Sequence, residues 1–312
     1  MLTVTMNPAL DKNSVAMHVI PTKKLRCKET SFSPGGGGVN VARVIHKMGE
    51  RVQAVYLGGG FIGDIFENLL NEESINQDRI KIENQMRENF TVREEASGNQ
   101  YRFVMPGAFV KKSEWEKSLD LIIKKGYRED FLVISGSLPP NIPTDFYKQL
   151  ILHLRDYDVK IVVDTSGEPL KKLRKTGLYI LKPNLNELEE LTGRKLETEE
   201  DQEKAAQELI EEGTCEIVVL SLGTGGVLLL TRETKERFRS PTVKVISRIG
   251  AGDSTVAGMM VGLMRKMSLR KSVMMAVAAG AAAVMTPGTE LCQKKDVDNL
   301  YKYMSQEKTF QN

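Results

Sequence analysis

Short apolar runs alternate with amphipathic stretches over most of the chain. The apolar runs have the length and composition of buried strands and cover residues 2–6, 52–57, 131–135, 160–164, 179–181 and 217–220. Between them, apolar residues recur at helical spacing near residues 39–48, 63–72, 112–125, 144–156 and 184–191. This alternation predicts βα units, so we expect an α/β fold with three layers, in which helices cover both faces of a mainly parallel sheet.

Two segments, residues 12–33 and 87–106, interrupt this alternation. The second predicts an antiparallel hairpin, because residues 90–95 and 100–105 alternate between polar and apolar and flank a turn at 97–99. We expect the two segments to pair into a small sheet that closes over a substrate, pairs with a second copy, or both. A surface hairpin without such a role is the alternative. Residues 1–312 are expected to form one domain with these insertions, ending in a frayed tail from Ser305 onward.

The composition disfavours several classes of protein. The 312 residues are 41% hydrophobic, and 44 basic against 41 acidic residues give a net charge of +3. The basic residues are scattered, which does not indicate nucleic-acid binding. No membrane contact or targeting is expected, because the longest apolar run, residues 273–285, is too short to cross a bilayer. Three cysteines and three histidines without metal or disulfide spacing predict a cytoplasmic protein without a zinc site.

The most informative motif is Gly250-Ala251-Gly252-Asp253, which precedes an apolar run that predicts a helix. The first turn of a helix leaves backbone N–H groups unpaired, and the glycines let these groups point at an anion. The carboxylate of Asp253 would repel a bare phosphate. It fits better as a base that takes a proton from a hydroxyl attacking that phosphate, as in a kinase. A glycine-rich turn with Asp253 as helix N-cap is the alternative.

A second motif is PGGGGVNVAR at residues 34–43. Four successive glycines cost much chain entropy, which is typical of a backbone that approaches a ligand closely. Asn40 lies in the first turn of the next expected helix, in position to bind sugar hydroxyls. Asp11 follows the first strand and faces the same crevice, since ligands gather beyond the carboxyl ends of parallel strands. A tight strand-to-helix turn is the alternative explanation of the glycines.

Two further motifs follow later strands. In LKPNLNE at residues 181–187, Asn184 and Glu187 share one side of the first helical turn. There Glu187 can hold Mg²⁺, directly or through water, although a capping interaction explains the spacing equally well. The sequence SLGTGG at residues 221–226 can bring backbone N–H groups to a nucleotide phosphate or form a hairpin turn.

Other nucleotide-binding patterns are disfavoured. Gly58, Gly60 and Gly63 form GxGxxG after a strand, but only Asp78 or Glu83 can supply the acidic residue that a dinucleotide site needs. The GxxxxGK[ST] phosphate loop is absent from the sequence, which excludes a P-loop kinase.

The motifs NPALD, PGGGGVNVAR, LKPNLNE and GAGDS, in this order, resemble those of the PfkB carbohydrate kinases of the ribokinase-like superfamily, over nearly the whole chain. The resemblance implies a ribokinase-like αβα sandwich with a small β-sheet lid. It implies a catalytic base and an anion hole at Asp253, Gly250, Ala251 and Gly252. It implies sugar binding by Asp11, Gly36, Gly37 and Asn40, with the sugar's phosphate near Arg26, Arg87 and Ser137. ATP and its Mg²⁺ would be bound by Lys24, Lys182, Asn184, Glu187, Ser221 and Gly223.

Within this family, the four-glycine motif, the hairpin EASGNQYRFVMPGA and ISGSLPP at residues 134–140 are most similar to the minor type of 6-phosphofructokinase. Gly37 stands where many 1-phosphofructokinases and tagatose-6-phosphate kinases carry lysine. The resemblance implies ATP-dependent phosphorylation of fructose 6-phosphate at its C1 hydroxyl, a step of glycolysis, by a homodimer formed through the lid.

The resemblance leaves alternatives open. Tagatose 6-phosphate or fructose 1-phosphate could be the substrate, and a regulator that binds sugar phosphate or nucleotide without turnover is a further alternative. Ser247 and Arg248 replace the Asp-Thr pair that many relatives carry before GAGD, so activation by K⁺ is not implied.

Overall fold

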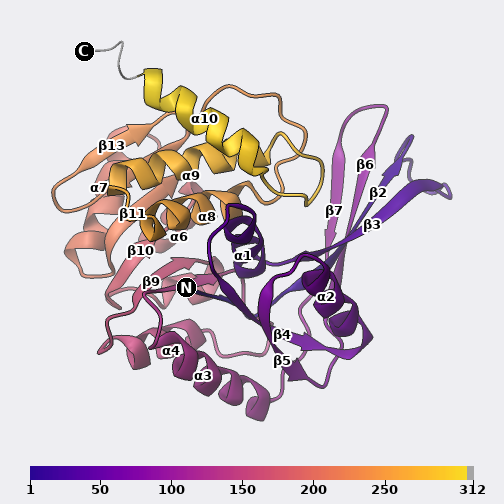
Figure 1. The fold of residues 1–312 in the computed structure, drawn as a ribbon, viewed down its shortest axis with the longest axis horizontal. Coiled ribbons are helices and arrows are strands. Elements are labelled where there is room, and N and C mark those ends of the chain that lie inside the picture. Colours follow the sequence, from indigo (N-terminus) through magenta and orange to yellow (C-terminus); the bar gives the residue numbers. More distant parts are fainter. Residues whose placement is uncertain (308–312) are drawn as a thin grey trace.

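The computed structural model describes residues 1–307, which form a nine-stranded sheet and a separate four-stranded sheet (Figure 1). The order in the large sheet is β13-β12-β11-β10-β9-β8-β1-β4-β5. Its pairs are parallel from β5 to β11 and antiparallel from β11 to β13. The strands are β1 (Leu2–Thr5), β4 (Gln53–Gly59), β5 (Asn76–Ile82), β8 (Phe131–Ser135), β9 (Lys160–Asp164), β10 (Leu178–Leu181), β11 (Cys215–Ser221), β12 (Val227–Leu230) and β13 (Lys235–Phe238).

Helices cover both faces of this sheet, as the sequence predicts (Figure 1). One core lies under α1 (Gly37–Lys47), α2 (Gly60–Glu72), α8 (Ala251–Met264), α9 (Leu269–Ala283) and α10 (Lys294–Glu307). The other lies under α3 (Lys112–Gly126), α4 (Phe146–Leu154), α5 (Gly167–Lys171), α6 (Leu185–Thr192) and α7 (Glu199–Glu211). In β8, Val133 enters the first core and its neighbours Leu132 and Ile134 enter the second, because side chains alternate across a strand. Burial on both faces explains why the strands appear as continuous apolar runs.

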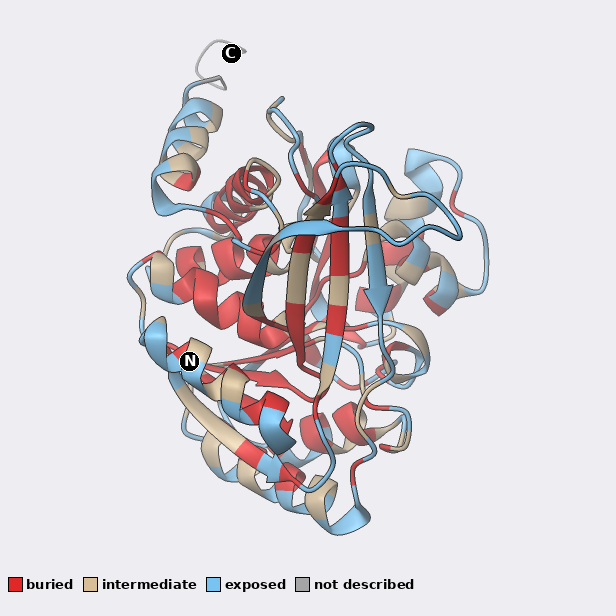
Figure 2. Ribbon diagram, turned by 90° about the vertical axis from the view of Figure 1, so that its right-hand side faces the viewer, coloured by how far each residue is buried: buried red, intermediate tan, exposed pale blue. Residues whose placement is uncertain are grey.

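The small sheet, the lid, is built from the two segments that interrupt the alternation. Its strands are β2 (Ala9–Ala16), β3 (Cys27–Gly35), β6 (Arg87–Glu94) and β7 (Gln100–Val104), in the order β3-β2-β6-β7. The expected hairpin is β6–β7, and β2 pairs in parallel with β6, so the two segments do pair with each other. In Figure 2 the inner strands β2 and β6 carry the buried residues, and the outer strands are largely exposed.

The two faces of the lid differ in chemistry. Register places Ser33, Asp11, Asn89 and Val104 in one row across the four strands, on the face that carries the buried Asp11 and Asn89. The neighbouring row, on the opposite face, is Phe32, Lys12, Phe90 and Phe103. Phe32 and Phe103 are about half exposed, at 45% and 51%. The lid therefore has a polar inner face and an aromatic outer face.

The remaining sequence expectations have mixed outcomes. The SLGTGG segment forms the turn of the β11–β12 hairpin. The GxGxxG turn is filled by Arg79, whose Nε donates to the carbonyl of Gly58 at 2.9 Å and whose Nη1 bonds Asp64 at 2.6 Å, which gives these glycines a packing role. α10 includes Ser305, and residues 308–312 of the expected frayed tail lie outside the described part. None of the described helices is long and apolar enough to cross a membrane.

Candidate active site

The sequence motifs converge at the carboxyl ends of the parallel strands, opposite the inner face of the lid. Asp11 and Arg87 lie on the lid, and the groups of the main domain follow β8, β9, β10 and β11 or begin α1 and α8. In this fold class such an edge is where ligands bind. We call the half next to Asp11 and Arg87 the lid side, and the half next to Lys182 and Ser221 the β10–β11 side.

Asp253 lies in the first turn of α8, where the two halves meet. Its Oδ2 accepts a hydrogen bond of 2.8 Å from Nδ2 of Asn40, in the first turns of α1. Burial and the charge of Asp164 raise the pKa of Asp253 to about 6, against the opposing effect of the Asn40 bond and of Lys182. A carboxylate with this pKa is ionised at neutral pH and can accept a proton. Asn40 Oδ1 is buried and has no hydrogen-bond partner among the described residues.

The start of α8 has the features of an anion site. Gly250 is the N-cap in a left-handed conformation, with φ of 74°, and a Cβ there would lie 2.4 Å from Leu291 Cδ2. Glycine is therefore required by both conformation and packing. A Cβ on Gly252 would meet no described atom within 4 Å, so this position borders open space. The backbone N–H groups of Gly250, Ala251 and Gly252 precede the first helical hydrogen bonds and are available to an anion.

The four-glycine turn packs tightly against the sheet. A Cβ on Gly37 would lie 2.2 Å from Ser135 Oγ, and one on Gly38 would lie 2.5 Å from the Val4 carbonyl oxygen. Gly36 has φ of 117°, which side chains rarely adopt, and begins α1. The glycines are thus explained by packing of the strand-to-helix turn, the alternative that the sequence left open. This packing leaves the binding roles expected for Gly36 and Gly37 untested.

Asp11 is held by the lid itself. Its Oδ1 accepts a hydrogen bond of 2.8 Å from Nδ2 of Asn89 on the neighbouring strand, and only 4% of its surface is exposed. Burial raises the pKa of Asp11, while the Asn89 bond and the nearby charge of Arg102 oppose this shift. An ionised carboxylate in this setting has a free oxygen that can accept hydrogen bonds from hydroxyl groups.

Arg87 and Ser137 are brought together by Asn7. The Arg87 guanidinium donates to the carbonyls of Asn7 at 2.8 Å, Pro8 at 3.3 Å and Met105 at 3.0 Å. Asn7 Nδ2 in turn donates to Ser137 Oγ at 3.1 Å. Burial lowers the pKa of Arg87, although a guanidinium stays charged at neutral pH. Its remaining N–H groups and the exposed Ser137 hydroxyl suit a phosphate.

Lys24 and Arg26 do not join the site in their own chain. Both are exposed in the connection between β2 and β3, beyond the pair Ala16–Cys27. The strand from Asp11 to Ala16 spans roughly 17 Å at the usual rise per residue. The expected contacts of Lys24 with ATP and of Arg26 with the sugar phosphate therefore stay predictions.

On the β10–β11 side, Lys182 is buried, and its Nζ lies 3.1 Å from Asp164 Oδ1 at the end of β9. Burial alone would favour the neutral amine. The charges of Asp164, Glu187 and Asp253 outweigh this effect and raise the pKa of Lys182, so the ammonium is kept. The site thus holds a fixed cation close to Asp253.

Asn184 and Glu187 form a capping box at the start of α6. Asn184 Oδ1 accepts from the Glu187 N–H at 2.9 Å, and Glu187 Oε2 accepts from the Asn184 N–H at 2.8 Å. The capping alternative is therefore realised, and Glu187 keeps its second carboxylate oxygen for another ligand. Burial, together with the charge of Asp164, raises the pKa of Glu187. The backbones of Ser221 and Asn184 form an isolated parallel β-bridge. The Ser221 hydroxyl is buried and has no hydrogen-bond partner among the described residues.

Asp164 and Glu187 fit a Mg²⁺ ion. Both are carboxylates, the donors that Mg²⁺ prefers, and the charge of Asp164 helps to raise the pKa of Glu187. No group of three His, Cys, Asp or Glu side chains is close enough for a metal among residues 1–307. This donor set suits an ion that keeps several waters and binds substrate phosphates.

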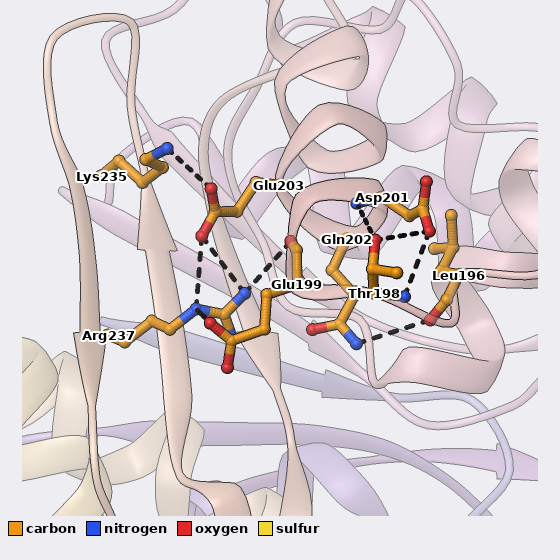
Figure 3. Close-up of polar contacts among 8 residues, drawn as sticks. All are labelled: Leu196, Thr198, Glu199, Asp201, Gln202, Glu203, Lys235 and Arg237. Atoms are coloured by element: carbon orange, nitrogen blue, oxygen red, sulfur yellow. Dashed lines mark hydrogen bonds and ion pairs between the residues drawn. The ribbon is translucent and has the colours of Figure 1, made fainter.

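Two cavities flank the β11–β12 turn. One, of about 480 Å³, lies between this turn, the segment 240–248 and helices α8 and α9; we call it the apolar pocket. The other, of about 750 Å³, lies toward α7 and includes Arg237 and Arg239. Figure 3 shows the rim of the second cavity, where Arg237 contacts Glu203 at 3.3 Å and Glu199 at 3.4 Å. The charge of Arg237 is therefore neutralised by Glu199 and Glu203 of the same chain.

Sequence reasoning missed four residues of the site: Asn7, Asn89, Arg102 and Asp164. Asp164 ends a predicted strand, just as Asp11 follows one, so its position at the carboxyl edge was a usable signal. Arg102 lies in the predicted hairpin and acts on Asp11 and Asp253 through its charge. The face of the lid on which Arg102 lies depends on strand register, which the sequence alone does not specify.

Comparisons with known proteins show the family and the fold. A family model described as pfkB family carbohydrate kinase matches residues 5–296. An ATP-dependent 6-phosphofructokinase isozyme 2 of Mycobacterium tuberculosis is 42% identical over 301 residues, covering 96% of this chain and 88% of that protein. The isozyme 2 of Escherichia coli is 39% identical over 306 residues, covering 97% and 98%. A crystal structure of the E. coli enzyme with substrates and products has a TM-score of 0.93 at 38% identity, covering 98% and 99%.

More distant relatives carry other names. A 1-phosphofructokinase of Borreliella burgdorferi is 30% identical, and a tagatose-6-phosphate kinase of Staphylococcus epidermidis is 28% identical. Other structures of the E. coli protein are described as a complex with potassium and as a tetrameric inhibited form. A ribokinase of Thermotoga maritima has a TM-score of 0.78 at 22% identity, so the fold is ribokinase-like. The order of motifs, the fold and the family match give one conclusion: this chain belongs to the pfkB family of carbohydrate kinases.

Proposed function

We propose that this protein transfers the γ-phosphate of ATP to the C1 hydroxyl of fructose 6-phosphate, giving fructose 1,6-bisphosphate. The observation that carries the proposal is Asp253, a carboxylate with a pKa of about 6 placed beside the unpaired N–H groups of α8. A base next to an anion site suits a hydroxyl that attacks a phosphate. The names of the relatives from M. tuberculosis and E. coli support the choice of substrate.

The lid side would hold the sugar. Asp11, Asn40 and the backbone of Gly36 and Gly37 bind its hydroxyls, and Asn40 Oδ1 is an acceptor that lacks a partner among residues 1–307. Arg87 and Ser137 face the existing phosphate. Arg102 adds positive charge on the same lid face.

The reaction itself requires a proton transfer and one displacement. Asp253 takes the proton of the C1 hydroxyl while that oxygen bonds to the γ-phosphorus and the bond from phosphorus to ADP breaks. The N–H groups of Gly250, Ala251 and Gly252 stabilise the charge on the transferred group. Most of the rate enhancement then comes from positioning and electrostatics.

The β10–β11 side would hold ATP. Lys182, Asn184, Ser221 and Gly223 bind its phosphates. Asp164 and Glu187 hold Mg²⁺, directly or through water, and the bound ion supplies positive charge to the phosphate oxygens. Activation by K⁺ is not part of the proposal, because Ser247 and Arg248 replace the Asp-Thr pair that many relatives carry before GAGD.

The outer face of the lid would pair with a second copy, giving a homodimer. The aromatic row there has Phe90 and Phe103 stacked at 6.4 Å between centroids, with Lys12 Nζ 5.5 Å from the Phe32 ring centroid. A contiguous apolar patch of this kind marks an interface. Pairing would also give Lys24 and Arg26 a route to the crevice of the partner. We place this assembly in a reducing cytoplasm, where the free thiols of all three cysteines persist.

The dimer is tested by sedimentation velocity. Phe103→Asp should shift the protein to monomer, because it places a charge at the exposed β7 end of the aromatic row. Phe109→Asp is the matched control, since Phe109 is 62% exposed but lies outside the lid strands. A Phe103→Asp protein with unchanged sedimentation would contradict the lid interface.

The activity is tested by ADP release, coupled to a reporter enzyme, on a panel of fructose 6-phosphate, tagatose 6-phosphate, fructose 1-phosphate and unphosphorylated fructose. We expect the highest kcat/KM with fructose 6-phosphate. Preference for another ketohexose phosphate would change the substrate but not the reaction class. Binding of sugar phosphate without ADP release from any of them would indicate the non-catalytic alternative.

A further inference from the structure

The apolar pocket contains one charged side chain, Arg248. Its walls are otherwise glycine, small polar residues and apolar residues, among them Val243, Val245, Val277 and Val284. No lining residue described for this pocket is acidic. Apolar walls of low dielectric constant focus the field of the Arg248 guanidinium into the cavity, which favours an anion there.

The backbone around Arg248 is fixed on both sides. The N–H groups of Ile246 and Ser247 both donate to the carbonyl of Val284, at 2.7 and 3.3 Å. Ser247 is buried, and its Oγ accepts from the Ile249 N–H at 3.2 Å. Because the loop is held in this way, the origin of the arginine side chain is fixed before any ligand binds.

The Arg248 side chain is available to a ligand. Arg248 is exposed, and within residues 1–307 no hydrogen bond or ion pair of its guanidinium is recorded. By contrast, Arg237 in the neighbouring cavity is neutralised by Glu199 and Glu203. An arginine without a carboxylate partner keeps its planar set of donors available for phosphate oxygens.

Arg248 shares its pocket with the anion site. Ala251 and Gly252, whose N–H groups begin α8, line the same cavity. A ligand with an apolar ring among the valines and a chain of phosphates reaching α8 would pass this guanidinium. This arrangement has the chemistry of a nucleoside polyphosphate site.

We propose that Arg248 contacts the phosphates of the bound nucleotide and so selects nucleoside polyphosphates over nucleosides. The proposal rests on the proposed function, since it takes ATP as the occupant of the apolar pocket. It assigns this chain a nucleotide contact at a position where its sequence departs from the Asp-Thr pattern before GAGD.

The test is isothermal titration calorimetry of ATP, ADP and adenosine, without sugar, on the full chain and on Arg248→Ala, Arg248→Lys and Lys244→Ala. Lys244 is the matched control, because it is an exposed cation in the same segment but does not line the pocket. We expect Arg248→Ala to weaken ATP and ADP binding about tenfold or more, the effect of losing a hydrogen bond to a charged group, and to leave adenosine unchanged. Arg248→Lys should recover part of the loss, and Lys244→Ala should match the parent.

Two results would overturn the assignment: ATP affinity that Arg248→Ala leaves unchanged, or an equal loss for ATP and adenosine. Steady-state kinetics give a second measurement, in which Arg248→Ala raises KM for ATP and not KM for the sugar. If the parent binds ATP with the expected dependence on Arg248 but phosphorylates no sugar, the proposed function fails and the nucleotide contact stands.

Discussion

The lid side and the β10–β11 side of the crevice are built differently. On the lid side, polar groups are already bonded to one another: Asp11 to Asn89, and Arg87 to three backbone carbonyls. On the β10–β11 side, Lys182 is likewise paired with Asp164, but the proposed ATP site also includes the apolar pocket, whose one charged lining residue is Arg248. The polar groups of the lid side are thus fixed before a ligand arrives, whereas the other side combines fixed charges with an apolar pocket that offers shape and backbone N–H groups.

This difference predicts where selectivity comes from. Buried polar groups that bond a substrate reject analogues that leave them unpaired, which gives strong discrimination. Apolar walls discriminate weakly, because a missing methylene costs little. Substitutions on the lid side should therefore change sugar kinetics strongly and ATP kinetics little. Asp253 and Asn40 join the two halves, so their loss should affect the chemical step itself.

The largest effect is expected for Asp253→Asn. The substitution keeps the shape of the side chain but removes the base, which should lower kcat by roughly 10² to 10⁴, the usual contribution of general base catalysis. KM values for both substrates should change much less. Near-normal turnover of the purified variant, with an unchanged circular dichroism spectrum, would remove Asp253 from the chemical step.

Arg87→Ala is expected next in size. It removes the guanidinium proposed to face the sugar phosphate, so KM for fructose 6-phosphate should rise by about tenfold to hundredfold while KM for ATP stays within about twofold. The ratio of kcat/KM between fructose 6-phosphate and fructose should fall in parallel. Equal increases of both KM values would show that Arg87 acts through the fold rather than on the phosphate.

Asp11→Asn should have a smaller effect of the same kind. The amide preserves the volume, but it loses the charge that binds sugar hydroxyls, so KM for the sugar should rise by about tenfold. Thr176→Val is a control, because this buried hydroxyl bonds only a backbone carbonyl, that of Leu173, and should change stability without changing KM. An Asp11→Asn enzyme with normal sugar KM would contradict the role of the lid's inner face.

The substitution Glu187→Gln distinguishes Mg²⁺ binding by Glu187 from capping of helix α6 by the same side chain. Glutamine also completes a capping box, so the melting temperature should stay the same. Loss of the carboxylate should instead raise the Mg²⁺ concentration needed for half-maximal activity several-fold. A lower melting temperature with an unchanged Mg²⁺ requirement would assign Glu187 to capping alone.

The smallest effect on kcat is expected from a modest decrease in pH. The pKa of Asp253 is raised to about 6. Its carboxylate is therefore fully ionised well above pH 6 and becomes protonated as the pH falls through this value. kcat should therefore halve near pH 6. Phosphate groups of the substrates also titrate near pH 6, so Asp253→Asn is the control, and its residual activity should lack the same inflection. An identical pH profile in both proteins would assign the inflection to the substrates.

Much of the fold followed from sequence because burial on both faces gives parallel strands an unmistakable apolar pattern. The less regular β5, with several half-exposed positions, and the antiparallel β13 were not anticipated, and β12 was implied only by the hairpin alternative for SLGTGG. Within the site, Asp253, Asn40 and Asp11 were predicted because their motifs place them at helix starts and strand ends. The Asn89–Asp11 bond was not, since it joins residues 78 positions apart through the register of two lid strands.

The places of Lys24 and Arg26 in the fold could not be predicted from the motifs. Their charge suits phosphates, and the resemblance assigns them to the site, but the β2–β3 hairpin carries them to the far end of the lid. Strand length and direction decide that distance, and neither is fixed by the motif. The four glycines also gave an ambiguous signal, because tight packing against Ser135 and Val4 demands glycine as strictly as a ligand would.

The most direct test of the central claim is a crystal structure of the protein with fructose 6-phosphate and a non-hydrolysable ATP analogue. The account predicts the C1 hydroxyl within about 3 Å of the Asp253 carboxylate, with the terminal phosphate of the analogue over the N–H groups of Gly250, Ala251 and Gly252. Ligands bound in separate places, or an Asp253 carboxylate turned away from the hydroxyl, would contradict it.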